Sequence, residues 1–487
     1  MKNTFLKIIS LVLIFAMILT FASCKSDKSK KANSETETVK ISDKDKGHFR
    51  VGYGRKDVTP EEPVALAGYG NTSNRLSDGY LDSIYVSCIA VSDEKDNTIL
   101  LFSVDVVNIS EQKVQTLIAP VARATGVKAQ NIFVNCSHTH SAPDLLSGLG
   151  PNVLFNTILQ SGFKESAIEA MNDRTKSKLY YGNTTTSALN FVRHYFGDDG
   201  TCVGDNHNAV GYTGTIVRHT TDSDRTFHVV KFEREGKKDV LLTSFRAHGT
   251  MTGGTSKSDI SADWIGALRT EAEKSGDCYL SYFQGAAGNQ NPSSRIASEV
   301  LTKDFRQYGK LLNEFLTNTL SNMTLVKNTD IKAITSKVAL DINHSEDSKS
   351  AYATLVSSYW STTYNSAGCV EMGKPYGIYS QYHANGILSK ISLGKNKTIT
   401  LGAFAIGDIA FSCASYEQFD TNGCFVATNS PFKYTVPVGY TNGANGYIPS
   451  SYAYQYGCYE VDIGSFAAGS GEVAANKLVE MLNQIHN

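Results

Sequence analysis

Thr98-Ile-Leu-Leu-Phe-Ser-Val-Asp105 and Asn131-Ile-Phe-Val-Asn-Cys136 are the two stretches that decide the fold. Both are almost wholly apolar, as strands are when packed layers cover both faces of their sheet. The residues between them, 111–124, are typical of a helix, and Ser110 is placed to cap its start. A strand, a helix and a second strand in this order predict an α/β sheet with helices packed on it.

The same alternation continues along the chain. Further buried strands are expected at 239–245 and 278–283, and further helices at 154–171, 263–274 (with Asp263 as N-cap) and 301–320. The last third differs: we expect two strands within 398–411, a loop rich in Gly, Asn and Tyr over 416–459, and a closing helix at 472–484. The predicted class is α/β, a layered mixed sheet flanked by helices, with a metal site at the strand ends.

The N-terminus is predicted to be an export signal. Two lysines precede an apolar run over residues 8–22, which is too short for a comfortable membrane span. Phe21-Ala-Ser-Cys24 resembles a bacterial lipobox, in which the cysteine is acylated and becomes the mature N-terminus. Residues 1–23 are therefore interpreted as a lipoprotein signal peptide, with an ordinary signal peptide or an uncleaved anchor as alternatives.

A polar stretch follows Cys24. Residues 25–47 are rich in Lys, Ser and acidic residues and contain no aromatic residue, so they cannot bury a core. We interpret 24–47 as a disordered tether and 48–487 as the folded domain. The predicted location is the extracytoplasmic face of a bacterial cell membrane, with the chain held there by the lipid on Cys24.

The composition excludes one class of function. The 487 residues carry 46 basic and 47 acidic side chains, a net charge of -1, so the chain lacks the excess of basic residues that is typical of a nucleic-acid binder.

The cysteines are expected to be mostly free thiols. No two cysteines form a CxxC pair. Cys88, Cys136 and Cys278 lie in apolar strands and are expected to be buried free thiols, while Cys413 and Cys424 are the one disulfide candidate.

Histidines follow two of the predicted strands. Asn135-Cys-Ser-His138-Thr-His140-Ser-Ala-Pro143 closes one apolar strand. Residues two apart along a strand share a face, so His138 and His140 are expected to look into one cavity, as His-x-His pairs that bind metals do. Strand 239–245 ends similarly, in Arg246-Ala-His248-Gly249. The alternative is that these histidines are ordinary hydrogen-bonding groups.

A third strand ends in small residues. Gln284-Gly-Ala-Ala-Gly288 follows strand 278–283. The backbone amides of Gly285, Ala286, Ala287 and Gly288 could hold an oxyanion, because small residues allow a ligand to approach the backbone closely. The alternative is a tight turn without a catalytic role.

Several motifs together carry a resemblance to a known family. They are Val51-Gly-Tyr-Gly-Arg-Lys-Asp57-Val-Thr-Pro60, Ser103-Val-Asp105, Ser137-His-Thr-His-Ser-Ala-Pro143, Asp259-Ile-Ser-Ala-Asp263-Trp-Ile-Gly266 and Tyr447-Ile-Pro-Ser-Ser, followed by Tyr454 and Tyr459-Glu460. Over about residues 50–485 the chain resembles the catalytic domain of the neutral/alkaline (non-lysosomal) ceramidase family. The resemblance implies that family's catalytic-domain fold.

The resemblance also implies a set of site residues. One zinc ion is expected on four ligands: His138, His248, Glu417 and Tyr447. His140 is expected to contact substrate or support the ligands and to shuttle a proton, Arg193 to reach the substrate, and Tyr459 to support the oxyanion. The alternatives are a solvated loop acid for Glu417, a packing ring for Tyr447 and a surface arginine for Arg193.

The chain departs from the family in the small-residue turn. Family members carry a serine there, proposed as the nucleophile, whereas residues 284–288 contain none, and Asn289 stands where the family has Asp. Residues 340–395 contain no motif that we can match to the family. The expected function is a zinc-dependent hydrolase of amide bonds in N-acyl substrates such as ceramide, with zinc-bound water attacking. The alternatives are a non-catalytic binding lipoprotein on the same fold, and a zinc hydrolase of another amide or ester, such as cell-wall material.

Overall fold

The computed structural model describes residues 47–69, 75–254 and 257–487. The predicted signal peptide, the lipidation site Cys24 and all of the tether except Gly47 lie outside the described residues. Within those ranges, no helix has both the length and the apolar composition needed to cross a bilayer.

Nine strands form the largest sheet among the described residues, in the order β14-β12-β11-β6-β1-β3-β4-β5, with β16 paired to β6. Their bounds are β1 (Phe49–Asp57), β3 (Tyr85–Ser92), β4 (Thr98–Val104), β5 (Ile132–Cys136), β6 (Thr175–Thr185), β11 (Thr226–Arg234), β12 (Asp239–Phe245), β14 (Cys278–Gln284) and β16 (Thr324–Val326). The pairs β4–β5 and β12–β14 are parallel and the others antiparallel, so the sheet is mixed. The four strands that were predicted from their apolar runs are all present, as β4, β5, β12 and β14, so these predictions are confirmed.

The two ends of this sheet meet. The side-chain oxygen of Asn135 in β5 accepts a hydrogen bond from the Gln284 amide of β14 at 2.7 Å. Ser103 in β4 donates to the carbonyl of Tyr282 in β14, also at 2.7 Å. The sheet therefore curls until its first and last strands touch, and the carboxyl ends of β5, β12 and β14 come together at one place.

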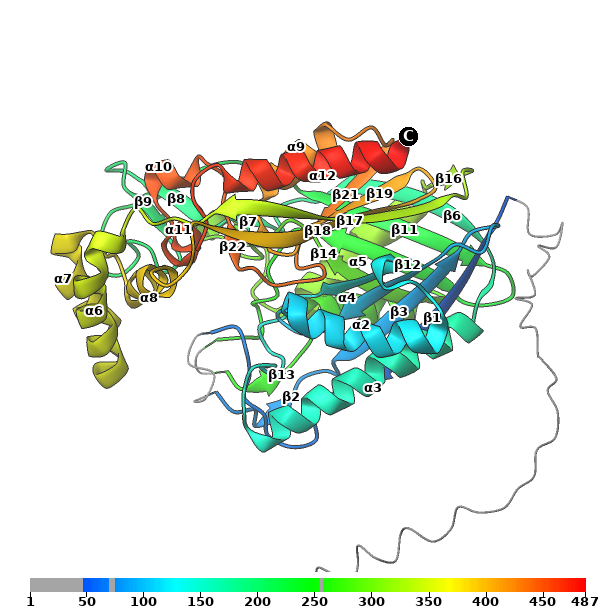
Figure 1. Cartoon of the computed structure of the whole chain (residues 1–487), viewed down its shortest axis with the longest axis horizontal. Helices are drawn as coiled ribbons and strands as arrows, with labels where there is room; N and C mark the ends of the chain where they lie inside the picture. The colour runs from blue at the N-terminus through cyan, green and yellow to red at the C-terminus, as the bar shows by residue number, and fades with distance from the viewer. Residues whose placement is uncertain (1–46, 70–74, 255–256) are drawn as a thin grey trace, which may run out of the picture. The chain divides into compact units, whose positions relative to one another are not determined.

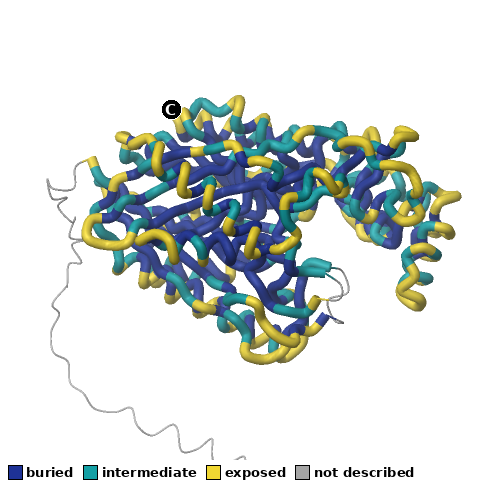
Figure 2. Tube along the Cα trace, turned by 180° about the vertical axis from the view of Figure 1, so that it is seen from behind, coloured by how far each residue is buried: buried dark blue, intermediate teal, exposed yellow. Residues whose placement is uncertain are grey.

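Helices and a second sheet cover the two faces of the large sheet (Figure 1). Helices α2 (Glu111–Thr125), α3 (Gly150–Asn172), α4 (Asp263–Ser275) and α5 (Phe305–Leu320) pack on one face. Phe133 and Phe283 on the other face pack against Phe404 and Phe411 of the second sheet. That sheet runs β17 (Ile331–Asp341), β18 (Asn396–Ile406), β19 (Ile409–Cys413), β21 (Tyr434–Val438), and α12 (Ser470–His486) covers its far side. Figure 2 shows the buried residues, in dark blue, gathered in the interior of the folded chain, with most exposed residues at its periphery. The layered α/β class is confirmed.

The remaining elements are short or belong to one insertion. The short strands are β2 (Gly79–Tyr80), β7 (Phe191–Val192), β8 (His194–Gly197), β9 (Cys202–Gly204), β10 (Ile216–His219), β13 (Asp259–Ile260), β15 (Gln290–Asn291), β20 (Glu417–Gln418) and β22 (Tyr447–Ile448). The remaining α-helices are α6 (Ser350–Thr363), α7 (Ser366–Gly373), α8 (Gln381–Lys390), α9 (Asp420–Thr428), α10 (Ala453–Tyr456) and α11 (Tyr459–Ile463). Helices α6–α8 lie within residues 340–395, for which the sequence motifs gave no match to the family.

Several expectations about local structure need correction. Asp263 is the first residue of α4 rather than its cap, and its carboxylate instead accepts hydrogen bonds from the amide and hydroxyl of Thr252, both at 2.7 Å. Helix α5 begins at Phe305 because Asp304 caps it through the Gln307 amide. The stretch 416–459 is not one loop, since it contains α9 and β21.

The cysteines of the described residues are all free. Cys88, Cys136 and Cys278 are buried, as expected. The proposed pairing of Cys413 with Cys424 is wrong: Cys413 is packed in β19, whereas the Cys424 sulfur lies 3.1 Å from a guanidinium nitrogen of Arg246.

Candidate active site

His138 follows β5 in a strained backbone conformation. Its φ of 62° lies in the left-handed region that residues other than glycine seldom adopt. Nδ1 donates to the Val107 carbonyl at 2.7 Å, so the lone pair of the neutral ring is on Nε2. The strand ends at Cys136, so the expectation that His138 and His140 alternate along a strand is wrong, yet their rings do converge, with 3.1 Å between the two Nε2 atoms.

His248 follows β12 and is fully buried. Its Nδ1 donates to the Gln290 carbonyl at 3.0 Å, so its lone pair is likewise on Nε2, which lies 3.5 Å from Nη1 of Arg193. The two histidine loops lie against each other, because the His140 amide donates to the Gly249 carbonyl at 2.8 Å. A Cβ on Gly249 would lie 2.9 Å from the Thr139 Cα, so this approach requires glycine.

Glu417 and Tyr447 are brought side by side by two short parallel strands. They are paired residues of β20 and β22, which places their side chains next to each other. One carboxylate oxygen of Glu417 lies 3.5 Å from Nε2 of both His138 and His248. With 14% of its side chain exposed, Glu417 is not a solvated loop acid. Burial raises the pKa of Glu417, and His138 and Arg193 partly oppose that rise.

These side chains fit a bound cation. Neutral imidazole nitrogens and a carboxylate are the donors that zinc takes in proteins. Burial lowers the pKa of His138 and His140 well below the usual value and that of His248 to about 3, so all three rings are neutral at neutral pH. The ligand nitrogens of the three histidines lie within 4.8 Å of one another. The geometry therefore adds His140 to the candidate ligands beside Tyr447.

Arg193 is buried in the cavity wall, which rules out the surface-arginine alternative. Its Nε donates to Glu460 at 2.5 Å, and its Nη2 donates to the Tyr447 hydroxyl at 3.0 Å. The second oxygen of Glu460 lies 2.7 Å from His194 Nε2. Burial raises the pKa of the Glu460 carboxyl, but Arg193 and His194 outweigh this and hold it below its ordinary value.

Glu460 and His194 were not singled out from the sequence. The motifs quoted contain Glu460 only as the neighbour of Tyr459, and His194 is the residue that follows Arg193. One signal could have identified Glu460: Arg193 and Glu460 carry opposite charges and lie in two segments that were already assigned to the site.

A cavity of about 670 Å³ opens beside these residues, within the usual range for small-molecule sites. Its wall includes His138, His140, Arg193, Glu417, Tyr447 and Tyr459. Apolar wall residues include Ala67, Val107, Leu145 and Ile463, and polar ones include Asp205, Asn206, Thr250 and Asn291. Burial raises the pKa of Tyr459, so its phenol keeps its proton and can donate a hydrogen bond into the cavity.

The small-residue turn does not line this cavity. The amides of Gly285 and Gly288 donate to the carbonyls of Phe245 and Gln418, so the prediction that they hold an oxyanion is wrong. Ala286 and Ala287 are fully buried and also absent from the cavity wall. A Cβ on Gly288 would lie 2.5 Å from the Glu417 carbonyl oxygen. The turn instead supports β20, which carries Glu417.

The described chain is thus a layered α/β protein with a buried cluster of potential metal ligands at the wall of a cavity. Residues 49–286 match the family described as "Neutral/alkaline non-lysosomal ceramidase, N-terminal". The resemblance expected from the sequence motifs is therefore confirmed.

Solved structures agree with this match. A ceramidase in complex with C2 superposes with a TM-score of 0.68 at 14% identity, covering 90% of this chain and 75% of that one. The neutral ceramidase from Pseudomonas aeruginosa gives a TM-score of 0.67 at 15% identity, with the same coverage. No curated protein matches the chain in sequence. The family and the fold together support a ceramidase-like hydrolase.

Proposed function

We propose that this chain is a zinc-dependent hydrolase of the amide bond in N-acyl substrates, ceramide among them. One observation carries the proposal: the Nε2 atoms of His138 and His248 both lie 3.5 Å from the same oxygen of Glu417, and His138 and Glu417 line the cavity. Such a set of donors has no structural need to converge, because each histidine already has a backbone partner for its other nitrogen.

Each residue of the site has a separate role in the proposed reaction. His138, His248 and Glu417 would hold the ion, and we propose Tyr447 rather than His140 as the fourth ligand, which leaves the His140 ring available to exchange a proton. Bound zinc supplies a Lewis acid that polarises the scissile carbonyl and makes hydroxide accessible near neutral pH. His140 accepts and returns the proton, and Tyr459 donates a hydrogen bond to the oxygen that gains negative charge. Arg193 orients the substrate, with its own charge balanced by Glu460.

Water, rather than a side chain, is proposed to attack the carbonyl. The turn that holds a serine in the family has none here, and Ala286 and Ala287 are buried away from the cavity. The reaction adds water across the amide and releases a carboxylic acid and an amine. It requires no covalent intermediate on the protein.

Metal content and hydrolysis test the proposal together. We expect one zinc per chain in the wild type, loss of zinc in His138→Ala and His248→Ala, and retention in His344→Ala, a partly exposed histidine that serves as control. We expect the zinc-loaded wild type to release amine from a panel of N-acyl substrates. A folded wild type that takes up no zinc would refute the proposal and favour a binding lipoprotein on the same fold.

We also propose that the chain is attached to the membrane through a lipid on Cys24. The support is the lipobox-like sequence and the polar stretch after it. In a bacterial host, the wild type is expected to sediment with membranes and to incorporate labelled fatty acid, and Cys24→Ser to do neither. Equal labelling of both proteins would refute the anchor without bearing on the zinc site.

A further inference from the structure

Helices α6–α8 form an insertion in the connection between two neighbouring strands. Strands β17 and β18 are antiparallel partners, and their ladder closes at the pair Asp341 and Asn396. The chain leaves the sheet at this pair, forms the three helices and returns to the same pair. The helices have a small core of their own, which includes Val356, Ile378 and Ile387. They are therefore not needed to complete the sheet.

Helix α8 packs closely on α11, the short helix that begins at Tyr459. A Cβ on Gly386 would lie 2.1 Å from the carbonyl oxygen of Asp462, so the two backbones touch with no space for a side chain. One turn later, the buried Lys390 donates to the carbonyl of Gly464 at 3.3 Å. The close backbone contact at Gly386 and the hydrogen bond from Lys390 to Gly464 hold α11 in one position.

Asp462 joins this contact to a second wall segment. It is buried, and its carboxylate lies 2.7 Å from Nδ1 of His207 and 3.8 Å from Nδ1 of His383 in α8. Nε2 of His383 lies 2.9 Å from Glu346, at the start of the insertion. One carboxylate thus lies between a histidine of the insertion and a histidine of the 204–207 turn.

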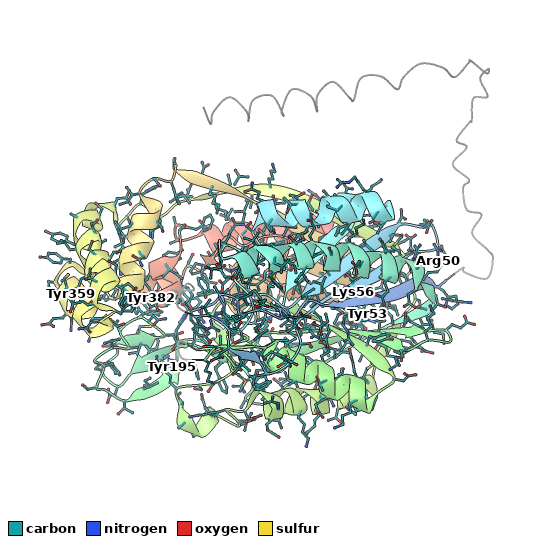
Figure 3. All side chains as sticks on the ribbon, turned by 90° about the horizontal axis from the view of Figure 1, so that it is seen from below. Arg50, Tyr53, Lys56, Tyr195, Tyr359 and Tyr382 are labelled. Atoms are coloured by element: carbon teal, nitrogen blue, oxygen red, sulfur yellow. The ribbon has the colours of Figure 1, made fainter. Side chains whose placement is uncertain are left out.

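Both segments held in this way face the cavity. Tyr459 and Ile463 of α11 line it, and so do Asp205 and Asn206, which immediately precede His207. The Tyr382 ring of α8 meets the Tyr459 ring edge-on, with 5.6 Å between their centroids. Figure 3 shows Tyr382 on the side of the insertion that faces the rest of the chain, whereas Tyr359 lies on its outer side.

We propose that the helical insertion is a support for the cavity wall, in which Gly386, His383 and Tyr382 of α8 are positioning residues that fix Tyr459 at the reacting carbonyl. This inference rests on the proposed hydrolase function for its kinetic consequence. The insertion touches none of the candidate metal ligands through these contacts, so it sets the placement of Tyr459 without affecting the ion.

Gly386→Ala is the main test, and Gly373→Ala is its matched control. A Cβ on Gly373 would lie 2.5 Å from the Ile378 carbonyl oxygen, a similar clash that stays inside the insertion. Displacing a catalytic group by about 1 Å can cost about 100-fold in rate. We expect Gly386→Ala to lower kcat by about that factor with zinc content and KM unchanged, and Gly373→Ala to leave kcat unchanged. Tyr382→Leu, which inserts nothing into the contact, is expected to lower kcat less and provides a second variant if Gly386→Ala does not fold.

Two further readouts separate positioning from general damage. In a Tyr459→Phe background, the α8 substitutions are expected to lower kcat less than threefold, because their target is already lost. Amide hydrogen exchange in 204–207 and 459–464 is expected to quicken in Gly386→Ala and not in Gly373→Ala. Equal kcat losses in both backgrounds, or unchanged exchange, would overturn the proposal. If the wild type hydrolyses no amide, the proposed function fails, and the exchange comparison alone decides whether the insertion holds α11.

Discussion

Replacing Glu460 with glutamine removes the negative charge that Arg193 and His194 share in the cavity wall. Glu460 is fully buried, and 7% of the Arg193 side chain is exposed, so the guanidinium would lose its counter-charge where water cannot replace it. Breaking a buried ion pair by removing one partner costs about 3–5 kcal/mol. The glutamine keeps the size and one acceptor of the glutamate, so we expect about 3 kcal/mol, the lower end of that range.

The expected shift in unfolding temperature follows from the length of the folded chain. At about 2.1 cal/mol/K per residue, a domain of some 440 residues loses roughly 1 °C for each kcal/mol. Glu460→Gln should therefore lower the midpoint by about 3 °C in a thermal scan. The control is Glu480→Gln, which removes an exposed partner of Lys477 and should leave the midpoint unchanged.

The same variant should impair turnover more than stability. Arg193 contacts Tyr447 and the Gly288 carbonyl besides Glu460, so it stays near the cavity but loses its strongest orienting bond. We expect kcat/KM for an N-acyl substrate to fall about 100-fold with zinc content unchanged. Wild-type turnover in a folded, zinc-loaded Glu460→Gln protein would refute the reasoning, and so would a midpoint at or above that of the wild type.

Three other substitutions test separate parts of the site. Burial raises the pKa of Glu417 in the folded state, so its charge destabilises the fold once the pH exceeds the pKa of the unfolded state. Glu417→Gln should therefore raise the unfolding midpoint of the metal-free protein at pH 7 but not at pH 3, where the carboxyl is protonated in both states. The same substitution should abolish zinc uptake. Gly249→Ala should force the two histidine loops apart at Thr139 and weaken zinc affinity at least tenfold in a chelator competition, whereas unchanged affinity would contradict the glycine argument. Ala287→Ser should produce no acyl-enzyme burst in stopped-flow kinetics, since its hydroxyl would be buried outside the cavity; a burst would show that the turn can reach substrate.

The strands and their layers could be predicted because their signal is local. An apolar run such as 98–105 predicts a strand that other layers of the protein bury on both faces, and this holds whichever strands lie beside it. The observed strand β4 matches the run to within one residue. The stretch 416–459 failed for the opposite reason. Its Gly and Asn residues signal turns, but β21 forms there because β19 lies alongside to pair with it, which no local pattern records.

The site could be predicted in part for a related reason. His138 and His248 each follow an apolar strand, so position along the chain identified them. The role of Glu460 depends on a contact with Arg193, 267 residues away in the chain, which only the folded structure reveals. The small-residue turn was wrongly assigned because composition shows where a ligand could approach the backbone. It does not show which backbone amides already donate hydrogen bonds within the protein.

Closure of the large sheet explains why the candidate ligands meet at all. His138 follows β5, at one end of the strand order, and His248 follows β12, one strand from the other end, so contact of β5 with β14 is what brings them together. That contact runs through Asn135, whose side-chain amide also donates to Gly439, in the segment that leads back from β21 toward Tyr440 and the Glu417 carboxylate. Asn135 therefore joins β14 to the segment beside Glu417, so one buried side chain connects the strand ends that lead to His138 and His248 with the segment beside Glu417, without a hydrogen bond of its own to any of these three candidate ligands.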